Sequence, residues 1–134
     1  MPGNWENKVV IVTGGSRGLG YDLAGKFADA GAKVTIAARD PDALAQAAAK
    51  LREGGADVLT VPTDVTVQAE VDEMIRQTLD RYGRIDVLIN NAGKSTRGKI
   101  VETTAEQFAE LLTLNFLGLV RCTRAAIPHL LLSQ

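Results

Sequence analysis

Short apolar segments rich in β-branched residues alternate along this 134-residue chain with longer segments of helical periodicity. The apolar segments are bounded by Gly, Pro, Asp or Asn and span residues 9–12, 34–38, 58–61 and 85–89. Short continuous apolar runs of this kind are typical of strands buried on both faces. Because strand–helix–strand units wind right-handedly, the alternation predicts one α/β domain over residues 1–134, with a parallel sheet and helices on both faces.

The intervening segments carry helix start signals of their own. Asp40 precedes Pro41, a pair typical of a helix N-cap followed by proline at the first helical position. Thr104 and Gln107 have the spacing of a capping box, which predicts the start of the last helix. Apolar spacing and glycines at the ends place the other helices. The predicted helices cover residues 18–30, 41–53, 67–82 and the region after 104.

The composition excludes several classes of protein. The 15 basic and 16 acidic residues leave a net charge of -1, which gives no electrostatic basis for binding nucleic acid or anionic lipid. Cys122 is the only cysteine and His129 the only histidine, so an intramolecular disulfide and a Cys/His metal cluster are excluded. No apolar run approaches 18 residues. We therefore expect a cytoplasmic protein with no metal site and no membrane partner.

A glycine-rich turn, Thr13-Gly14-Gly15-Ser16-Arg17-Gly18-Leu19-Gly20, joins the first predicted strand to the first helix. Such a turn lets backbone N–H groups approach a pyrophosphate, while the positive end of the helix dipole faces the negative charge. The spacing Gly-x-x-x-Gly-x-Gly differs from the commoner Gly-x-Gly-x-x-Gly, and no Gly-Lys-Ser/Thr follows, which excludes a Walker A loop. A tight connection without a ligand stays open as the alternative.

The end of the second predicted strand indicates which ligand the turn would hold. Folds that bind NAD or S-adenosylmethionine tend to place Asp or Glu there, whereas this chain has Ala38 followed by Arg39. Arg39 follows Gly20 by 19 residues, and Arg17 projects from the glycine turn toward the same end. Two guanidinium groups suit a 2′-phosphate, so we predict NADP(H) rather than NAD(H). The alternative is that both arginines are solvated surface cations.

The glycine turn resembles that of the short-chain dehydrogenase/reductase family when it is combined with Asn90-Asn91-Ala92-Gly93 after the fourth predicted strand. Asp64-Val65 after the third strand and Asn115 in the last helix fit the same family, and the resemblance extends from Lys8 to about Leu131. It implies a Rossmann-type doubly wound sheet with strand order 3-2-1-4, incomplete at its C-terminal side.

The resemblance also implies roles for individual residues. Asp64 would bond the adenine amino group with Val65 packed near the ring, and Asn115 would be the catalytic asparagine that holds a water in a proton relay. Asn90 and Ala92 would line the ribose side of the cofactor. The alternative for residues 90–93 is a turn that ends the strand, and the alternative for Asn115 is a hydrogen bond to backbone; neither needs a ligand. The predicted cofactor-binding residues are Thr13, Gly14, Ser16, Arg17, Gly18, Leu19, Gly20, Arg39, Asp64, Val65, Asn90, Ala92 and Gly93.

One part of the family pattern is missing from the chain. The family uses a serine and a Tyr-x-x-x-Lys pair, but Tyr21 is followed at +4 by Gly25 and Tyr82 by Asp86. We therefore expect the cofactor-binding half of an NADP(H)-dependent oxidoreductase that interconverts a small-molecule carbonyl and an alcohol, inactive as an isolated chain. The alternative is a catalytically inert NADP(H)-binding module, or a partner of a full-length relative.

The last predicted helix is apolar on more than one face, with Phe108, Leu112 and Phe116 among its side chains. The strand over residues 85–89 would lie at the edge of the sheet although its composition is that of an interior strand. Because the family uses this helix in a subunit interface, we expect a homo-oligomer formed through the C-terminal helix.

Overall fold

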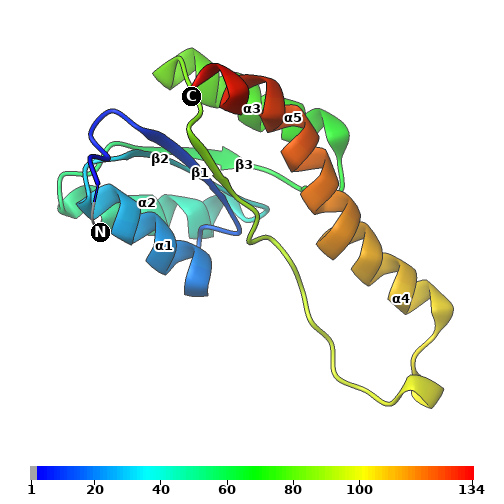
Figure 1. The fold of residues 1–134 in the computed structure, drawn as a ribbon. Coiled ribbons are helices and arrows are strands. Elements are labelled where there is room, and N and C mark those ends of the chain that lie inside the picture. Colours follow the sequence, from blue (N-terminus) through cyan, green and yellow to red (C-terminus); the bar gives the residue numbers. More distant parts are fainter. Residues whose placement is uncertain (1–2) are drawn as a thin grey trace.

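The computed structural model describes residues 3–134. They contain a four-stranded parallel sheet with the order β3-β2-β1-β4 (Figure 1). The strands are β1 (Val9–Thr13), β2 (Lys33–Ala38), β3 (Val58–Pro62) and β4 (Val87–Ile89). Every pairing in the sheet is parallel, and β1 pairs with both β2 and β4. The predicted Rossmann-type architecture and strand order are therefore confirmed, with β4 at an open edge of the sheet.

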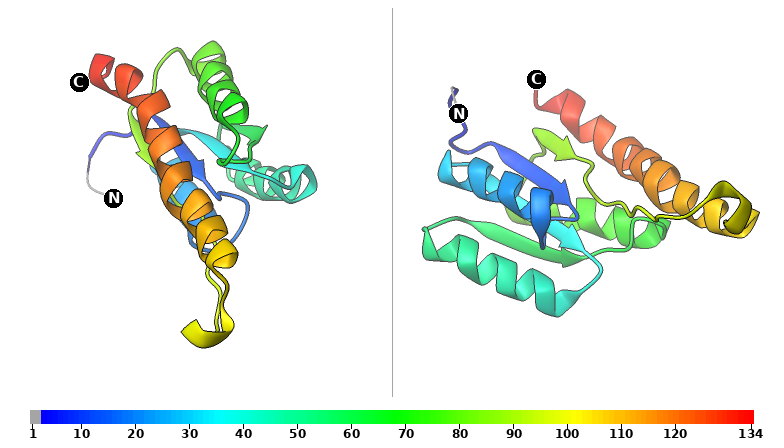
Figure 2. Two further views of the ribbon diagram at one scale, coloured as in Figure 1. Left: turned by 90° about the vertical axis from the view of Figure 1, so that its right-hand side faces the viewer. Right: turned by 90° about the horizontal axis from the view of Figure 1, so that it is seen from below.

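Helices cover both faces of the sheet, as Figures 1 and 2 show. Successive strand residues point to opposite faces, so Val10 and Val12 pack beneath α1 and α2 while Ile11 packs with α3 and α5. All three of these side chains are fully buried. The helices are α1 (Gly18–Asp29), α2 (Pro41–Glu53), α3 (Gln68–Tyr82), α4 (Ala105–Leu112) and α5 (Gly118–Leu132).

Both predicted helix caps are present. The Asp40 side chain accepts hydrogen bonds from the backbone N–H groups of Asp42 and Ala43, at 2.9 and 3.3 Å, and so satisfies amides that α2 leaves unpaired. Thr104 and Gln107 form the reciprocal capping box at the start of α4. The local sequence therefore determines where these two helices begin.

The last helix is less regular than its sequence predicted. A π-helical segment, η2 (Thr113–Leu117), joins α4 to α5, and Asn115 lies at its centre. A short 3-10 helix, η1 (Ile100–Glu102), precedes α4 within the long connection that follows β4. π-Helical insertions often occur at functional sites, because they change the direction in which the inserted side chains point.

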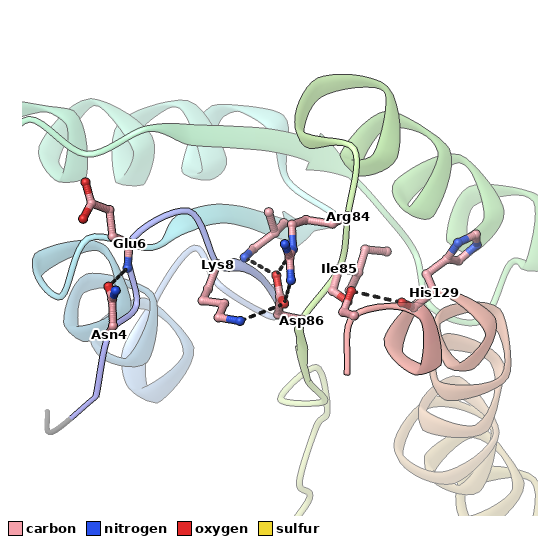
Figure 3. Close-up of polar contacts among 9 residues, drawn as sticks. Asn4, Glu6, Lys8, Arg84, Ile85, Asp86 and His129 are labelled. Atoms are coloured by element: carbon pink, nitrogen blue, oxygen red, sulfur yellow. Dashed lines mark hydrogen bonds and ion pairs between the residues drawn. The ribbon is translucent and has the colours of Figure 1, made fainter.

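The fourth strand is shorter than the predicted segment over residues 85–89. Asp86 stands where another strand residue was expected, and its carboxylate accepts a hydrogen bond of 2.9 Å from the Val9 N–H. Arg84 and Lys8 surround the same carboxylate (Figure 3). The Asp86 carboxylate thus accepts the hydrogen bond from Val9 that a backbone carbonyl would accept in a regular parallel pairing. The regular pairing therefore begins later, and β4 has three residues.

The C-terminal helical region, α4, η2 and α5, carries exposed apolar side chains, as its apolar composition predicted. Together with the unpaired edge of β4, these side chains leave apolar surface open to solvent. Within residues 3–134 no helix has both the length and the apolar character needed to traverse a bilayer. The exposed side chains are Phe108, Leu112, Phe116, Leu117, Leu119, Ile127, Leu131 and Leu132.

Candidate functional site

The glycine turn between β1 and α1 leaves backbone amides available at the start of α1. Gly14 and Gly18 have φ angles of +64° and +56°, which favour glycine. A Cβ on Gly20 would collide with the Gly14 carbonyl oxygen and the Asn91 side chain, whereas one on Gly18 would meet nothing within 4 Å. The helix has no side-chain cap and no acidic residue in its first turn, so its positive end is open to an anion.

The segment that follows β4 is fastened to this turn. The buried Thr13 hydroxyl accepts hydrogen bonds from the backbone N–H groups of Asn91 and Ala92, both 3.0 Å long. The Asn91 side chain in turn donates to the Gly14 carbonyl at 3.1 Å. Asn90 turns away, and its side-chain amide donates to the Thr123 hydroxyl on α5 at 3.0 Å. These bonds hold the ends of β1 and β4 in one fixed arrangement.

A cleft of about 650 Å³ lies along the carboxyl ends of the four strands. In parallel α/β sheets, ligands bind outside this edge. The lining includes eight of the predicted residues: Gly14, Ser16, Arg17, Arg39, Asp64, Val65, Ala92 and Gly93. The lining does not include Thr13, Gly18, Leu19, Gly20 or Asn90.

A second cleft, of about 660 Å³, adjoins the first and reaches along the connection between β4 and α4. The two clefts share Arg39, Asp64, Lys94 and Leu114 in their linings, so they lie side by side. Lys94 and Leu114 were not among the predicted site residues. Lys94 directly follows Gly93, so its position after the fourth strand was a usable signal, whereas nothing in the sequence marked Leu114.

Three cationic residues line the cleft, namely Arg17, Arg39 and Lys94. Arg17 and Arg39 are both exposed, and across residues 3–134 neither guanidinium group forms an ion pair or a hydrogen bond. Hydrogen bonds from the Thr66 hydroxyl and amide, with the charge of Arg39, hold the pKa of Asp64 below its ordinary value despite partial burial. The cleft therefore presents two free guanidinium groups together with the ionised carboxylate of Asp64, and Asp40 and Lys94 also contribute to its lining.

Asn115 fixes the connection that follows β4. Its Oδ1 accepts a hydrogen bond from the Lys94 N–H, and its Nδ2 donates one to the Lys94 carbonyl, each 2.8 Å long. A Cβ on Gly93 would lie 3.0 Å from Asn115 Oδ1, so a larger residue there would press on the Asn115 side chain. The π-helical segment thus places the amide of Asn115 against backbone beside the cleft.

The two tyrosines lie outside the cleft. Neither Tyr21 nor Tyr82 contributes to the lining of either hollow. The Tyr82 hydroxyl donates a hydrogen bond of 2.9 Å to Asp57, and burial together with that carboxylate raises the pKa of Tyr82. Tyr82 is therefore engaged elsewhere and does not face the site.

Comparison with known proteins gives the site a family context. The model of the short chain dehydrogenase family matches residues 8–134. The structure of L-sorbose reductase from Gluconobacter frateurii, complexed with NADPH and L-sorbose, superimposes on 97% of this chain and 50% of that one, with a TM-score of 0.91 and 34% identity.

Relatives of known sequence agree with this likeness. Meso-2,3-butanediol dehydrogenase from Serratia marcescens is 36% identical over 127 residues, and dehydrogenase/reductase SDR family member 7 from Mus musculus is 34% identical over 133. The matches cover 95% of this chain but 50% and 39% of those proteins, so the chain spans half of the length of these two relatives or less. Because the family model covers nearly the whole sequence and the strand order agrees, this chain belongs to the short-chain dehydrogenase family.

Proposed function

We propose that residues 1–134 form the NADP(H)-binding Rossmann domain of an oxidoreductase that interconverts a carbonyl and an alcohol by hydride transfer. The observation that carries the proposal is the pair of unpartnered guanidinium groups, Arg17 and Arg39, on one cleft at the carboxyl edge of the sheet. Members of this family bind a nicotinamide cofactor, and the sorbose reductase structure contains NADPH.

The shape of the turn supports a dinucleotide. Gly14 and Gly20 allow close packing of β1, α1 and Asn91, and the open space beside Gly18 gives a pyrophosphate access to the amides of α1. The adjoining cleft volumes, about 650 and 660 Å³, lie in the range of small-molecule and cofactor sites. In this arrangement α1 holds the pyrophosphate, and Asp64 accepts a hydrogen bond from the adenine amino group.

The charges at the end of β2 support NADP(H) over NAD(H). Ala38 lines the cleft where an acidic residue would accept bonds from ribose hydroxyls, and Arg39 follows it. A charge-assisted hydrogen bond from a guanidinium group contributes about 1.5–3 kcal/mol. Arg17 and Arg39 would therefore favour the 2′-phosphate and gain nothing comparable from a ribose hydroxyl.

The chemistry of the reaction would come from the bound nicotinamide, which gives or accepts the hydride. The residues of this chain bind and orient the cofactor, and Asn115 keeps the connection at Lys94 in place beside it. Proton transfer needs a group within hydrogen-bonding reach of the reacting oxygen. Since the chain has no Tyr-x-x-x-Lys and Tyr82 is bonded to Asp57, we propose that the isolated 134-residue chain does not turn over.

The same observation on Tyr82 favours a second candidate function. A chain that binds NADP(H) without a proton donor would serve as an inert binding module, or as the partner of a full-length relative. Both candidate functions predict that the isolated chain does not oxidise NADPH, and an assay with a panel of carbonyl compounds tests this. Turnover by protein whose intact mass is that of 134 residues would contradict both the inert module and the inactivity of the isolated chain.

Exposed apolar side chains on α4 and η2 support assembly with a second copy. Phe108, Leu112 and Phe116 are 43%, 62% and 58% exposed, and they recur at intervals of four residues, which places them along one face of this helical region. Burying them against a like helix would remove a large apolar area from water. We propose a homo-oligomer formed through this face, which Leu112→Glu should shift to monomer in analytical ultracentrifugation.

The single cysteine supports a reducing compartment. Cys122 is buried on α5, and burial raises the pKa of its thiol to about 11. A buried, protonated thiol packs as a small apolar group and reacts poorly. We propose a cytoplasmic location because one cysteine cannot form the intramolecular disulfide that is common in oxidising compartments.

A titration with NADPH and NADH tests the choice of cofactor. Arg39→Asp should weaken NADPH binding at least tenfold and leave NADH binding unchanged, because it removes one guanidinium group and repels the phosphate. Lys50→Asp makes the same change of charge on the exposed surface of α2, outside the cleft, and should affect neither cofactor. Equal losses for NADPH and NADH in Arg39→Asp would refute the assignment.

A further inference from the structure

Asp64 and Thr66 form a tight local unit between β3 and α3. Asp64 Oδ1 accepts two hydrogen bonds from Thr66, one of 2.9 Å from the backbone N–H and one of 2.6 Å from the side-chain hydroxyl. The backbone bond alone is the common turn in which an aspartate caps the residue two positions on. The hydroxyl adds a second donor to the same oxygen and so fixes the rotation of the carboxylate.

The main chain around Asp64 is held as well. The Asp64 N–H donates to Glu70 Oε1 at 3.2 Å, and the Asp64 carbonyl accepts from the Val67 N–H at 3.0 Å. Both partners belong to the first turn of α3 or to the residue before it. The backbone of Asp64 is therefore anchored independently of Thr66, and the hydroxyl of Thr66 acts on the side chain.

The second carboxylate oxygen of Asp64 remains available. Across residues 3–134, Oδ2 has no hydrogen-bond partner, while Asp64 lines both adjoining clefts. An ionised carboxylate offers acceptors only. Arg39 lies on the same clefts and favours the ionised form through its charge. Asp64 thus presents one fixed acceptor and no donor to a bound ligand.

We propose that Thr66 is a positioning residue which occupies Oδ1 of Asp64, directs Oδ2 to the nucleotide base, and so makes the site select a base with an exocyclic amino group. This inference rests on the proposed NADP(H) function. The 6-amino group of adenine donates a hydrogen bond to a carboxylate. The 6-oxo group of hypoxanthine is an acceptor and faces the same oxygen without a proton between them, which disfavours the base.

The experiment measures the affinities of NADPH and of its hypoxanthine analogue by fluorescence titration. The wild-type chain should prefer NADPH at least tenfold. Thr66→Val removes the hydroxyl with little change in shape and should lower this preference at least threefold. Thr66→Ser restores a hydroxyl and should keep the preference within twofold of wild type. A smaller change in Thr66→Val would overturn the proposal.

Asp64→Asn provides a second test, in which the direction of the base preference changes. The asparagine Oδ1 still accepts from Thr66, which leaves Nδ2 as a donor toward the base. The preference should reverse toward the hypoxanthine analogue in Asp64→Asn, and the reversal should weaken at least threefold in the double variant with Thr66→Val, where only the backbone N–H of residue 66 still holds Oδ1. A reversal that persists undiminished in the double variant would show that the Thr66 hydroxyl does not orient the side chain.

Failure of the proposed function gives a different result from failure of the positioning role. If the folded wild-type chain binds neither nucleotide, the NADP(H) function and this inference both fall. If NADPH binds and Thr66→Val weakens it and the hypoxanthine analogue equally, only the positioning role is overturned.

Discussion

The side chain of Asn115 binds the main chain of Lys94 through two hydrogen bonds of 2.8 Å, one accepted by Oδ1 and one donated by Nδ2. This pair of bonds connects a π-helical turn to the segment that leaves β4, across 21 residues of sequence. The geometry that places Asn115 beside the cleft therefore also determines where Lys94 lies.

Asn115→Ala should release this connection. The loss of both hydrogen bonds at an exposed site is expected to lower the free energy of unfolding by about 1–2 kcal/mol. Amide exchange at Lys94 should accelerate, because its N–H loses its acceptor. Urea denaturation and hydrogen–deuterium exchange measure the two effects.

Glu110→Ala is the matched control for Asn115→Ala. Glu110 is exposed on α4, and its side chain forms no hydrogen bond or ion pair among residues 3–134. Its replacement should leave exchange at Lys94 unchanged. Unchanged exchange at Lys94 in Asn115→Ala would show that these two bonds do not hold the segment.

Gly20 and Gly25 should respond in opposite ways to alanine, although both lie in α1. A Cβ at Gly20 would press on the Gly14 carbonyl oxygen and Asn91 Nδ2, so Gly20→Ala should cost about 3 kcal/mol or more. At Gly25 the nearest atom is Leu51 Cδ2 at 3.6 Å, an ordinary contact. Gly25→Ala should therefore stabilise the chain by up to about 1 kcal/mol through helix propensity. Thermal unfolding of both variants measures the contrast, and a similar effect at the two positions would contradict it.

The features that the sequence predicted correctly depend on neighbours along the chain. The strand runs, the Asp40 cap and the Thr104 capping box each depend on residues within one or two helical turns, and right-handed crossovers then determine the order of the strands. Local patterns of this kind are visible in a single sequence.

The features that the sequence did not predict depend on distant partners. The length of β4 depends on Asp86 meeting Val9, and the orientation of Asn90 depends on Thr123. The π-helical turn accompanies the bond between Asn115 and Lys94, and a Cβ on Gly118 at its end would lie 2.7 Å from Val65. Periodicity carries no information on such contacts, because each forms only when separate elements have packed.

Asp86 should make stability depend on pH in the acid range. Its side chain is 7% exposed, and desolvation raises its pKa, but hydrogen bonds from Arg84 and the Val9 N–H and the charge of Lys8 outweigh this and lower the pKa below 3.8. A carboxyl whose pKa is lower in the folded chain stabilises it above the unfolded value. This contribution disappears as the pH falls through the folded value.

Asp86→Asn should therefore cost about 1–2 kcal/mol near pH 7 and progressively less below pH 3.8. Urea titrations of wild type and variant at pH 7 and at pH 3 give the two differences. Glu53→Gln, on the exposed end of α2 and outside any ion pair of residues 3–134, should show no such convergence. A cost for Asp86→Asn that stays constant with pH would mean that the charge of Asp86 adds nothing to stability.

Asp40 lies on the cleft beside Arg39, so its negative charge should oppose a 2′-phosphate. Its carboxylate also caps α2 through Asp42 and Ala43, and asparagine caps helices equally well. Asp40→Asn should therefore retain the stability of the helix and tighten NADPH binding several-fold, since removing a nearby like charge at a protein surface is worth about 1 kcal/mol. NADH binding should not change, and the gain should shrink at high salt because ions screen the interaction. Asp42→Asn removes the neighbouring charge outside the cleft and should give a smaller gain. Equal tightening of NADH and NADPH in Asp40→Asn would show that this end of the cleft does not receive the phosphate.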